Sequence, residues 1–304
     1  MDTIKVFDRQ TNKLTFEKTY GEFFLKLAYG DRWFSKIFYL VFLPITTSFP
    51  FLSTLYGWLQ KTKQSRKKIV PFIKNYDVDA SEFAQPVHTF TSFNDFFIRK
   101  LKPKARPIDL RENVVIMPAD ARYLVMRNVK QQETFSIKGG TFNLSSFLNS
   151  KPLAKKFEQG DMVIARLCPL DYHRFHFPFD CAIQEPASLI NGSLYSVSPW
   201  ALKKRSTILS ENKRILTLLS SPVFGLVACV EIGATCVGTI HQTCSKEKGI
   251  KKGEEKGFFS FGGSCLVMLF EPGRITFDKD LVQHSKQHIE IVGKWGSSLA
   301  IAQS

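Results

Sequence analysis

Residues 255–273 read EKGFFSFGGSCLVMLFEPG, and this stretch decides the fold class of the second half of the chain. Two apolar runs typical of β-strands flank the tripeptide Gly262, Gly263 and Ser264. Glycine reaches positive φ without steric penalty and serine is common in turns, so a tight turn between buried strands explains the pattern by itself. A chemical role for Ser264 needs support from the rest of the sequence.

The chain beyond residue 86 shares this texture of short apolar runs broken by glycine and proline. Such runs, rich in β-branched residues, are typical of strands four to eight residues long. Examples are NVVIMPAD (113–120), DMVIARLCPLDYH (161–173) and VFGLVACVEIGATCVGTIH (223–241). We therefore predict an α+β protein, with a helical, membrane-associated region at 1–85 followed by a β-rich catalytic domain at 86–304.

The N-terminal region combines an apolar segment with a basic one. Residues 37–59 carry no charged side chain and are long enough to cross a bilayer, but Pro44, Pro50 and five Ser or Thr residues argue against a span. Six cations follow at Lys61, Lys63, Arg66, Lys67, Lys68 and Lys74. Aromatic-rich apolar segments beside cations suit the membrane interface. The alternative is a pair of core helices with a solvated basic face.

Charge and cysteine content narrow the class of protein. The net charge of +15 favours an anionic partner: nucleic acid, anionic lipid or an acidic ligand. The six cysteines form no CxxC pair, which indicates reduced thiols rather than a zinc site. The first twenty residues carry charges throughout and lack an apolar core, so no secretory signal is predicted.

Two short motifs supply candidates for proton transfer. CPLDYHRFHFP (168–178) contains His173 and His176, and the aromatic neighbours and final proline argue against a metal-binding helix. Histidine suits proton transfer near neutral pH. MPADAR (117–122) places Asp120 after an apolar run, an ordinary turn unless the carboxylate orients a histidine as in a catalytic triad.

A base and a carboxylate give Ser264 a second interpretation. Serine becomes a nucleophile only with a base nearby. The GxSxG elbow of hydrolases is missing, because Ser264 leads into a strand rather than a helix. The unhindered carbonyl of Gly263 lies directly upstream of the hydroxyl. This geometry permits attack on the protein's own peptide bond and an N→O acyl shift that makes an ester between Gly263 and Ser264.

Ordered motifs over residues 65–275 resemble the phosphatidylserine decarboxylases, a family of pyruvoyl-dependent, self-cleaving enzymes. They are FTSFNDFFIRKLKPKARPI, MPADAR, LCPLDYHRFHFPFD, NGSLYSVSP, ENKRI, VEIGATCVGTI and KKGEEKGFFSFGGSCLVMLF. Three departures are Ala121 in place of a frequent Gly, Ser198 in place of Asn, and Cys265 in place of Thr or Ser. Residue 265 lies outside the bond-breaking atoms, so we expect cleavage to survive.

The resemblance implies β-elimination of the serine ester. A large chain, 1–263, would leave with a carboxylate on Gly263, and a small chain, 264–304, would carry a pyruvoyl cap made from Ser264. The two chains would remain together as a heterodimer. The pyruvoyl ketone would form a Schiff base with phosphatidylserine and accept the electron pair left by CO2, giving phosphatidylethanolamine. No metal and no pyridoxal phosphate would be needed.

The resemblance also assigns roles and partners. Asp120, His176 and Ser264 would form the self-processing triad, with His176 as base, and His173 would handle the substrate carboxylate or its protonation. The substrate lives in a bilayer, so we expect peripheral association with an anionic membrane, at the cytoplasmic face, rather than binding to nucleic acid. A homo-oligomer is compatible with the sequence.

Three alternatives stay open. A Ser/His/Asp lipid hydrolase would work as one intact chain of 34.7 kDa. A non-catalytic basic protein that binds membrane or nucleic acid would tolerate loss of His173, His176 and Asp120 together. A pyruvoyl decarboxylase for a soluble amino acid would not need residues 37–68.

Overall fold

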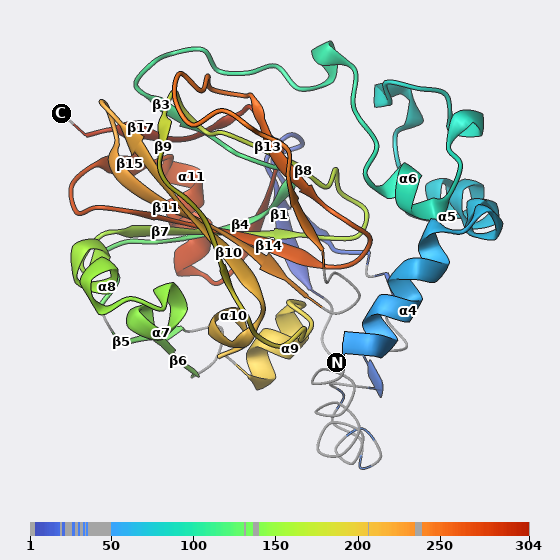
Figure 1. Cartoon of the computed structure of the whole chain (residues 1–304), viewed down its shortest axis with the longest axis horizontal. Coiled ribbons are helices and arrows are strands. Elements are labelled where there is room, and N and C mark those ends of the chain that lie inside the picture. The colour runs from blue at the N-terminus through green and yellow to red at the C-terminus, as the bar shows by residue number, and fades with distance from the viewer. Residues whose placement is uncertain are drawn as a thin grey trace.

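A nine-stranded sheet forms the centre of the molecule (Figure 1). The computed structural model describes residues 4–18, 20–21, 26–27, 30, 33, 35, 50–130, 132–135, 140–205, 207–234 and 239–303. The strand order is β2-β1-β16-β4-β7-β14-β11-β10-β9, and every neighbouring pair is antiparallel except β1 with β16. The strands are β1 (Lys5–Asp8), β2 (Lys13–Phe16), β4 (Ala121–Met126), β7 (Asp161–Leu167), β9 (Ala182–Ile190), β10 (Arg214–Ser221), β11 (Gly225–Gly233), β14 (Ser264–Phe270) and β16 (Glu290–Gly293).

Three smaller sheets accompany the central one. The first contains β12 (Ile240–Gln242), β13 (Glu255–Phe259) and β8 (Arg174–His176). The second contains β15 (Ile275–Phe277), β17 (Ser298–Ala302) and β3 (Val114–Ile116). The third pairs β5 (Gln132–Phe135) with β6 (Gly140–Asn143).

Both faces of the central strands are covered, and β14 shows how. Leu266 and Met268 pack on one face, against the first two small sheets, whereas Val267 and Leu269 pack on the other, against helices. Successive side chains of a strand point to opposite faces, so a strand covered on both sides needs an unbroken apolar run. The covering helices are α7 (Leu144–Leu148), α8 (Lys151–Phe157), α9 (Pro199–Lys204) and α10 (Ile208–Glu211).

A third group of elements lies at one side of the sheet (Figure 1). It consists of α4 (Pro50–Lys61), α5 (Ile69–Tyr76), α6 (Phe93–Phe97) and the short 3-10 helices η2 (Lys63–Lys68), η3 (Ala80–Glu82), η4 (Val87–Thr89) and η5 (Pro103–Ala105). Its aromatic cluster contains Phe72, Phe83, Phe90, Phe93, Phe96, Phe97 and Phe261. Phe261 comes from the turn before β14, so these helices pack directly on the segment that precedes Ser264. Helix α11 (Lys279–Lys286) contacts β4 and β16.

The predicted α+β class is confirmed, with strands dominating, whereas a helical, membrane-associated region over residues 1–85 is not. Residues 5–16, expected to be helical, form β1 and β2 of the central sheet, where Val6 and Phe7 are buried. Of the predicted membrane segment 37–59, residues 37–49 lie outside the described residues and the rest belongs to α4. Within the described parts of the chain, no helix combines the length and apolar character that crossing a bilayer requires.

Candidate active site

Ser264 is the first residue of β14, in the middle of the central sheet. Its register partners are Gly233 on β11 and Leu167 on β7. The residue is fully buried, and its hydroxyl has no hydrogen-bond partner among the described residues. Buried polar atoms are nearly always paired, because an unpaired one loses about 1–3 kcal/mol of hydration. This hydroxyl therefore does not serve the stability of the fold.

The two glycines before Ser264 differ in their backbone requirements. Gly262 has φ 138°, a conformation that residues with a side chain rarely adopt. The Phe261 N–H donates to the Asn94 side chain on α6 at 2.9 Å and holds the turn in place. At Gly263 an added Cβ would meet only Val197 and Ala234, at 3.8 and 3.9 Å. Position 263 therefore has room for a methyl group, whereas position 262 depends on glycine for its backbone conformation.

His173 lies beside this turn, at the end of the loop that joins β7 to β8. Its Nδ1 donates to the Asp171 carbonyl at 3.0 Å, which in the neutral ring leaves the lone pair on Nε2, a tautomer assigned from this bond. The Gly262 backbone approaches the ring, and the Phe97 ring lies 3.9 Å away between centroids. Burial lowers the His173 pKa to about 3, so the imidazole is neutral at pH 7.

His176 ends β8 and has a different set of partners. Its Nδ1 donates to the Gly253 carbonyl at 3.0 Å, and its Nε2 faces the Tyr172 hydroxyl at 3.3 Å. Trp295 stacks on the ring with 4.0 Å between centroids and 5° between planes. Burial lowers the His176 pKa to about 4, so this imidazole is also neutral at pH 7.

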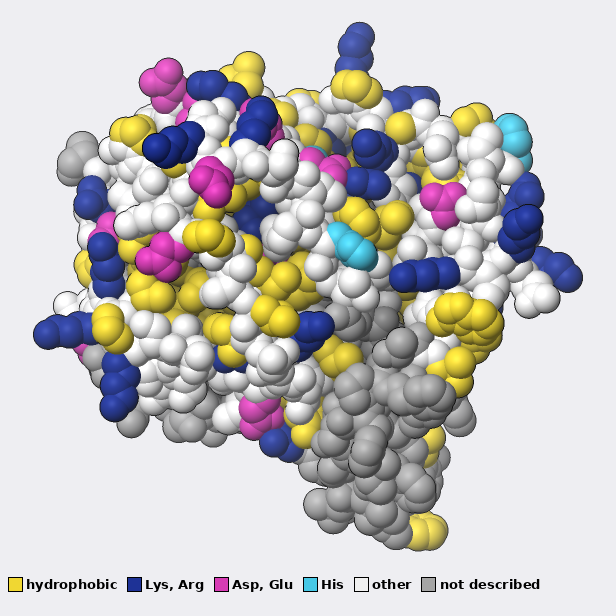
Figure 2. Space-filling view, viewed as in Figure 1, with side chains coloured by type: hydrophobic (Ala, Val, Ile, Leu, Met, Phe, Trp, Pro, Cys, Tyr) yellow, Lys and Arg dark blue, Asp and Glu magenta, His cyan; other side chains and the backbone are white. Residues whose placement is uncertain are grey.

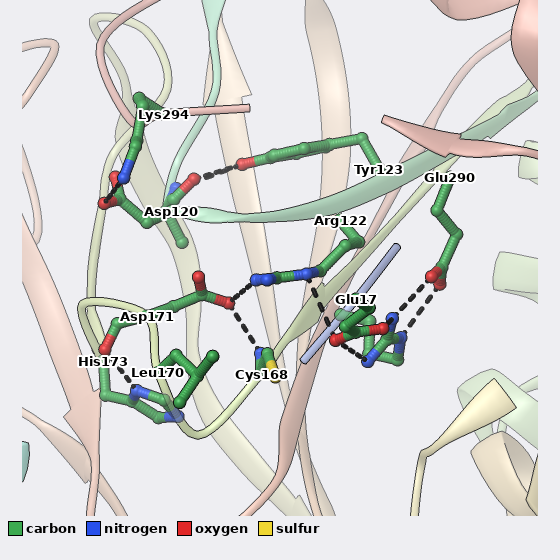
Figure 3. Close-up of polar contacts among 12 residues, drawn as sticks. Glu17, Asp120, Arg122, Tyr123, Cys168, Leu170, Asp171, His173, Glu290 and Lys294 are labelled. Carbon is green, nitrogen blue, oxygen red and sulfur yellow. Dashed lines mark hydrogen bonds and ion pairs between the residues drawn. The ribbon is translucent and has the colours of Figure 1, made fainter. Parts of the chain in front are cut away.

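Asp120 occupies the turn between β3 and β4. Arg106 binds its carboxylate, with 2.6 Å from Nη2 to Oδ2, and the Trp295 N–H donates to Oδ1 at 3.0 Å. Lys294 lies 3.4 Å from the same carboxylate (Figure 3). Burial alone would raise the Asp120 pKa, but the bonds to Arg106 and the nearby cations lower it. The carboxylate is therefore ionised at neutral pH.

The predicted site residues are brought together to different degrees. His173 reaches the Gly262–Ser264 turn, whereas Asp120 and His176 share Trp295 as a neighbour without a hydrogen bond between them in the described structure. Sequence reasoning missed Arg106 and Trp295, which hold Asp120. Arg106 lies inside a motif of the resemblance, KARPI, but nothing in the sequence pairs it with Asp120.

Ser264 thus begins a strand inside the central sheet and does not lie on the strand-to-helix elbow of the serine hydrolases. The chain is a member of the phosphatidylserine decarboxylase family, because the model of that family matches residues 93–297, more than half of the sequence.

Relatives named phosphatidylserine decarboxylase proenzyme extend the match beyond those residues. The protein from Chlamydia trachomatis serovar L2 is 49% identical over 247 residues, which cover 81% of this chain and 82% of the relative. The Chlamydia pneumoniae protein is 43% identical over 303 residues, covering 100% and 99%. The Fusobacterium nucleatum protein is 42% identical over 289 residues, covering 95% and 94%.

Proposed function

We propose that this protein is a phosphatidylserine decarboxylase made as a zymogen that cleaves itself between Gly263 and Ser264. The observation that carries the proposal is the buried hydroxyl of Ser264, which has no partner among the described residues and follows a turn that the neutral His173 imidazole approaches at Gly262. The name shared by the relatives supports both the reaction and the zymogen. The product, phosphatidylethanolamine, places the enzyme in phospholipid biosynthesis.

Self-cleavage uses only atoms of the chain and water. The Ser264 hydroxyl loses its proton to a base and attacks the Gly263 carbonyl; the C–N bond breaks, and an ester forms. A base then removes the Cα proton of residue 264, the Cβ–O bond breaks, and the Gly263 carboxylate leaves. The resulting dehydroalanine takes up water and releases its nitrogen as ammonia, leaving a pyruvoyl group on residue 264.

We assign the base of this step to His176, with Asp120 as a fixed negative charge near it. The ionised Asp120 favours the protonated form of His176, and Trp295 contacts both residues. To act as the base, His176 must release the Tyr172 hydroxyl from its Nε2 and accept the Ser264 hydroxyl there instead. Catalytic hydrogen bonds are often long or poorly aligned before the reacting complex forms, so the 3.3 Å contact with Tyr172 does not exclude this role.

The residues around position 264 fit a pyruvoyl group. Strand pairing with Gly233 and Leu167 fixes residue 264 in the sheet, and the hydroxyl that maturation removes makes no bond that the fold would lose. A pyruvoyl group supplies a ketone that condenses with an amine and accepts the electron pair released on decarboxylation.

His173 is placed to serve the substrate at this position. It adjoins Gly262 and the Phe97 ring, and its neutral imidazole puts no full charge beside a substrate carboxylate. Strong pairing of that carboxylate in the ground state would oppose CO2 release. We therefore propose that His173 lies beside the substrate carboxylate without a full charge, and that its free Nε2 takes up a proton from water and delivers it to the substrate carbon after CO2 leaves.

Membrane association of α4 and its surroundings is also part of the proposal. Trp58 on α4 is 59% exposed and Val70 on α5 is 64% exposed, next to the cations of η2. Figure 2 shows hydrophobic side chains beside Lys and Arg side chains on this side of the molecule. Exposed rings and cations together suit an anionic bilayer surface. We propose peripheral binding at the cytoplasmic face of the membrane.

Ser264→Ala tests the proposal, with Ser260→Ala as its matched control. Ser260 lies four residues upstream and bonds His241 at 3.1 Å, so its removal also deletes a hydroxyl from this turn. We expect the wild type and Ser260→Ala to separate into two chains and to decarboxylate phosphatidylserine. Ser264→Ala should remain one chain and be inactive. Normal decarboxylation by Ser264→Ala would refute the mechanism.

A further inference from the structure

We infer that Glu17 and Asp171 are positioning residues, which connect the N-terminal hairpin to His173 through a buried ion network. The inference rests on the function proposed above and adds two residues to which that function assigns no role. The network consists of Glu17, Arg122, Arg166, Asp171 and Glu290 (Figure 3).

Glu17 enters the network from the end of β2. Its backbone N–H donates to the Ile4 carbonyl at 2.9 Å, which continues the pairing of the hairpin. Its carboxylate is almost fully buried and lies 2.6 Å from Arg166 and 3.3 Å from Arg122. Burial alone would raise the Glu17 pKa, but the charges of Arg166 and Arg122 lower it to about 2. Glu17 is thus a fixed anion between two arginines.

Those two arginines need Glu17 because they are cross-strand partners. Arg122 on β4 and Arg166 on β7 occupy paired positions of the central sheet. Two buried like charges so close repel each other unless carboxylates lie between and beside them. Glu290 binds the outer side of Arg166 at 2.5 Å, and Asp171 binds Arg122. Among the described residues, only Glu17 forms an ion pair with both arginines.

Asp171 links the ion network to the loop between β7 and β8, which carries His173. Its carboxylate accepts from Arg122 and from the Cys168 N–H at 2.7 Å, while its carbonyl accepts from His173 Nδ1 at 3.0 Å. Arg99 donates to the same carbonyl at 3.2 Å. The side chain of Asp171 therefore fixes the loop, and its backbone fixes the tautomer and orientation of His173. Displacing the carboxylate would loosen both.

The network also gives the N-terminal hairpin a structural role in the site. Glu17 lies outside residues 93–297, which the family model matches, and 149 residues before Arg166. The hairpin is held separately by Arg9, which binds Asp278 at 2.6 Å and Asp280 at 2.7 Å. Docking of the hairpin and completion of the network can therefore be perturbed independently.

The experiment compares Glu17→Gln and Asp171→Asn in the full-length chain with the wild type. Self-cleavage, read as intact mass, reports that the fold and the turn have formed. We expect both variants to mature, because neither residue contacts Ser264 or His176. The decarboxylation rate constant, kcat, should then fall about 100-fold in Asp171→Asn and about 10-fold in Glu17→Gln, since misplacing a group by 1 Å has effects of this size. The KM should change little.

The pH profile separates positioning from simple destabilisation. The charged groups around His173 are Arg99, Arg122 and Asp171, and a looser loop admits water to the ring. The His173 pKa should then rise from about 3 toward its ordinary value. The acid limb of kcat should accordingly move to higher pH in both variants.

Two controls complete the design. Lys18→Gln removes a neighbouring charge whose partner, Asp77, lies at the exposed surface. Arg9→Gln weakens hairpin docking without touching the network. Both should keep the wild-type kcat and pH profile in the matured enzyme. Equal loss in Arg9→Gln and Glu17→Gln, failure of Glu17→Gln or Asp171→Asn to mature, or an unchanged acid limb would each overturn the inference. A wild type that never cleaves would instead refute the proposed function.

Discussion

At the scale of single residues, the two glycines before Ser264 meet different structural requirements. Gly262 holds a backbone conformation that suits only glycine, whereas Gly263 has room for a methyl group. We expect Gly262→Ala to reduce the free energy of unfolding by about 1–3 kcal/mol, the usual effect of such backbone strain. Gly263→Ala should be nearly neutral. Urea unfolding in a Ser264→Ala background, which keeps the protein as one chain, measures the free energy of unfolding of both variants. Equal losses in the two variants would contradict this prediction.

The two histidines should separate the two reactions. His176→Ala should accumulate the uncleaved precursor, because serine at its free pKa is a weak nucleophile. His173→Ala should cleave but fail to decarboxylate. Asp120→Asn should cleave slowly, since it keeps the bond from Trp295 but loses the charge. Chain masses and CO2 release read the two steps separately. The reverse pattern, with His173 needed for cleavage, would show that the roles are exchanged.

Burial of both imidazoles should also make stability depend on pH. Their folded pKa values, about 3 and about 4, lie below the unfolded value of 6.5. Between pH 6 and 5 the unfolded chain therefore binds more protons than the folded one, and folding weakens as pH falls. Two such groups lower the free energy of unfolding by about 2 kcal/mol per pH unit in this window.

His173→Gln provides the check on that slope. It removes one of the two buried imidazoles, so in the Ser264→Ala background the dependence between pH 6 and 5 should fall to roughly half. A slope identical to that of the parent would show that His173 is not held neutral by burial.

Histidines and serine could be proposed from sequence because their motifs are local. The partners of Asp120 could not, because Arg106 and Trp295 are separated from it by 14 and 175 residues. No periodicity or spacing links them; only the packing of η5 and the segment after β16 on the β3–β4 turn does so.

At the scale of elements, α6 holds the turn before Ser264 in place. Asn94 accepts from the buried Phe261 N–H, and Phe93 and Phe97 contact the Phe261 ring with centroids 5.3 and 4.9 Å away. Asn94→Ala leaves that N–H unpaired, so we expect a loss of about 1–3 kcal/mol in stability. Self-cleavage should slow as well, because the turn loses its anchor.

Asn143→Ala is the matched control for this element. Asn143 caps α7 by accepting from the Ser146 N–H at 2.9 Å, and its removal should reduce stability by about 0.5–2 kcal/mol. The α7 helix lies on the other cluster of the core, away from Phe261. The measurement is the self-cleavage half-time of each variant at an equal folded fraction. Equal half-times for Asn94→Ala and Asn143→Ala would show that α6 does not position the turn for cleavage.

Strands were predictable to the extent that their signal was local. The unbroken apolar run of β14 indicates a strand covered on both faces, and the structure confirms it. In contrast, β1 and β2 are four residues each, with sequences KVFD and KLTF that carry three charges between them. Their strand conformation depends on β16, which lies at the opposite end of the chain. Sequence alone could not supply that pairing.

At the scale of the whole molecule, four exposed apolar side chains of α4 and α5 flank the basic η2 helix in the sequence: Leu55, Trp58, Leu59 and Val70. Each cation near an anionic membrane contributes about 1 kcal/mol, which salt screens, whereas the apolar contribution persists. We expect binding to anionic vesicles that weakens with salt without vanishing. Co-sedimentation with vesicles of defined lipid composition measures it.

A variant with glutamine at five cations tests the electrostatic part of this prediction. The replaced residues are Lys61, Lys63, Arg66, Lys67 and Lys68. Vesicle affinity should fall, while turnover of a short-chain substrate dispersed in detergent should stay near the wild-type value, because the site lies over β14. Unchanged vesicle binding at low salt would leave the basic run as an ordinary solvated surface.

The intact masses of the purified wild-type chains test the central claim most directly. Self-cleavage with pyruvoyl formation predicts a large chain, 1–263, ending in an ordinary carboxylate at Gly263. It also predicts a small chain, 264–304, lighter by one ammonia than the same fragment with a serine terminus. An active preparation that contains only the intact 34.7 kDa chain, or a small chain with a free serine amino group, would contradict the account.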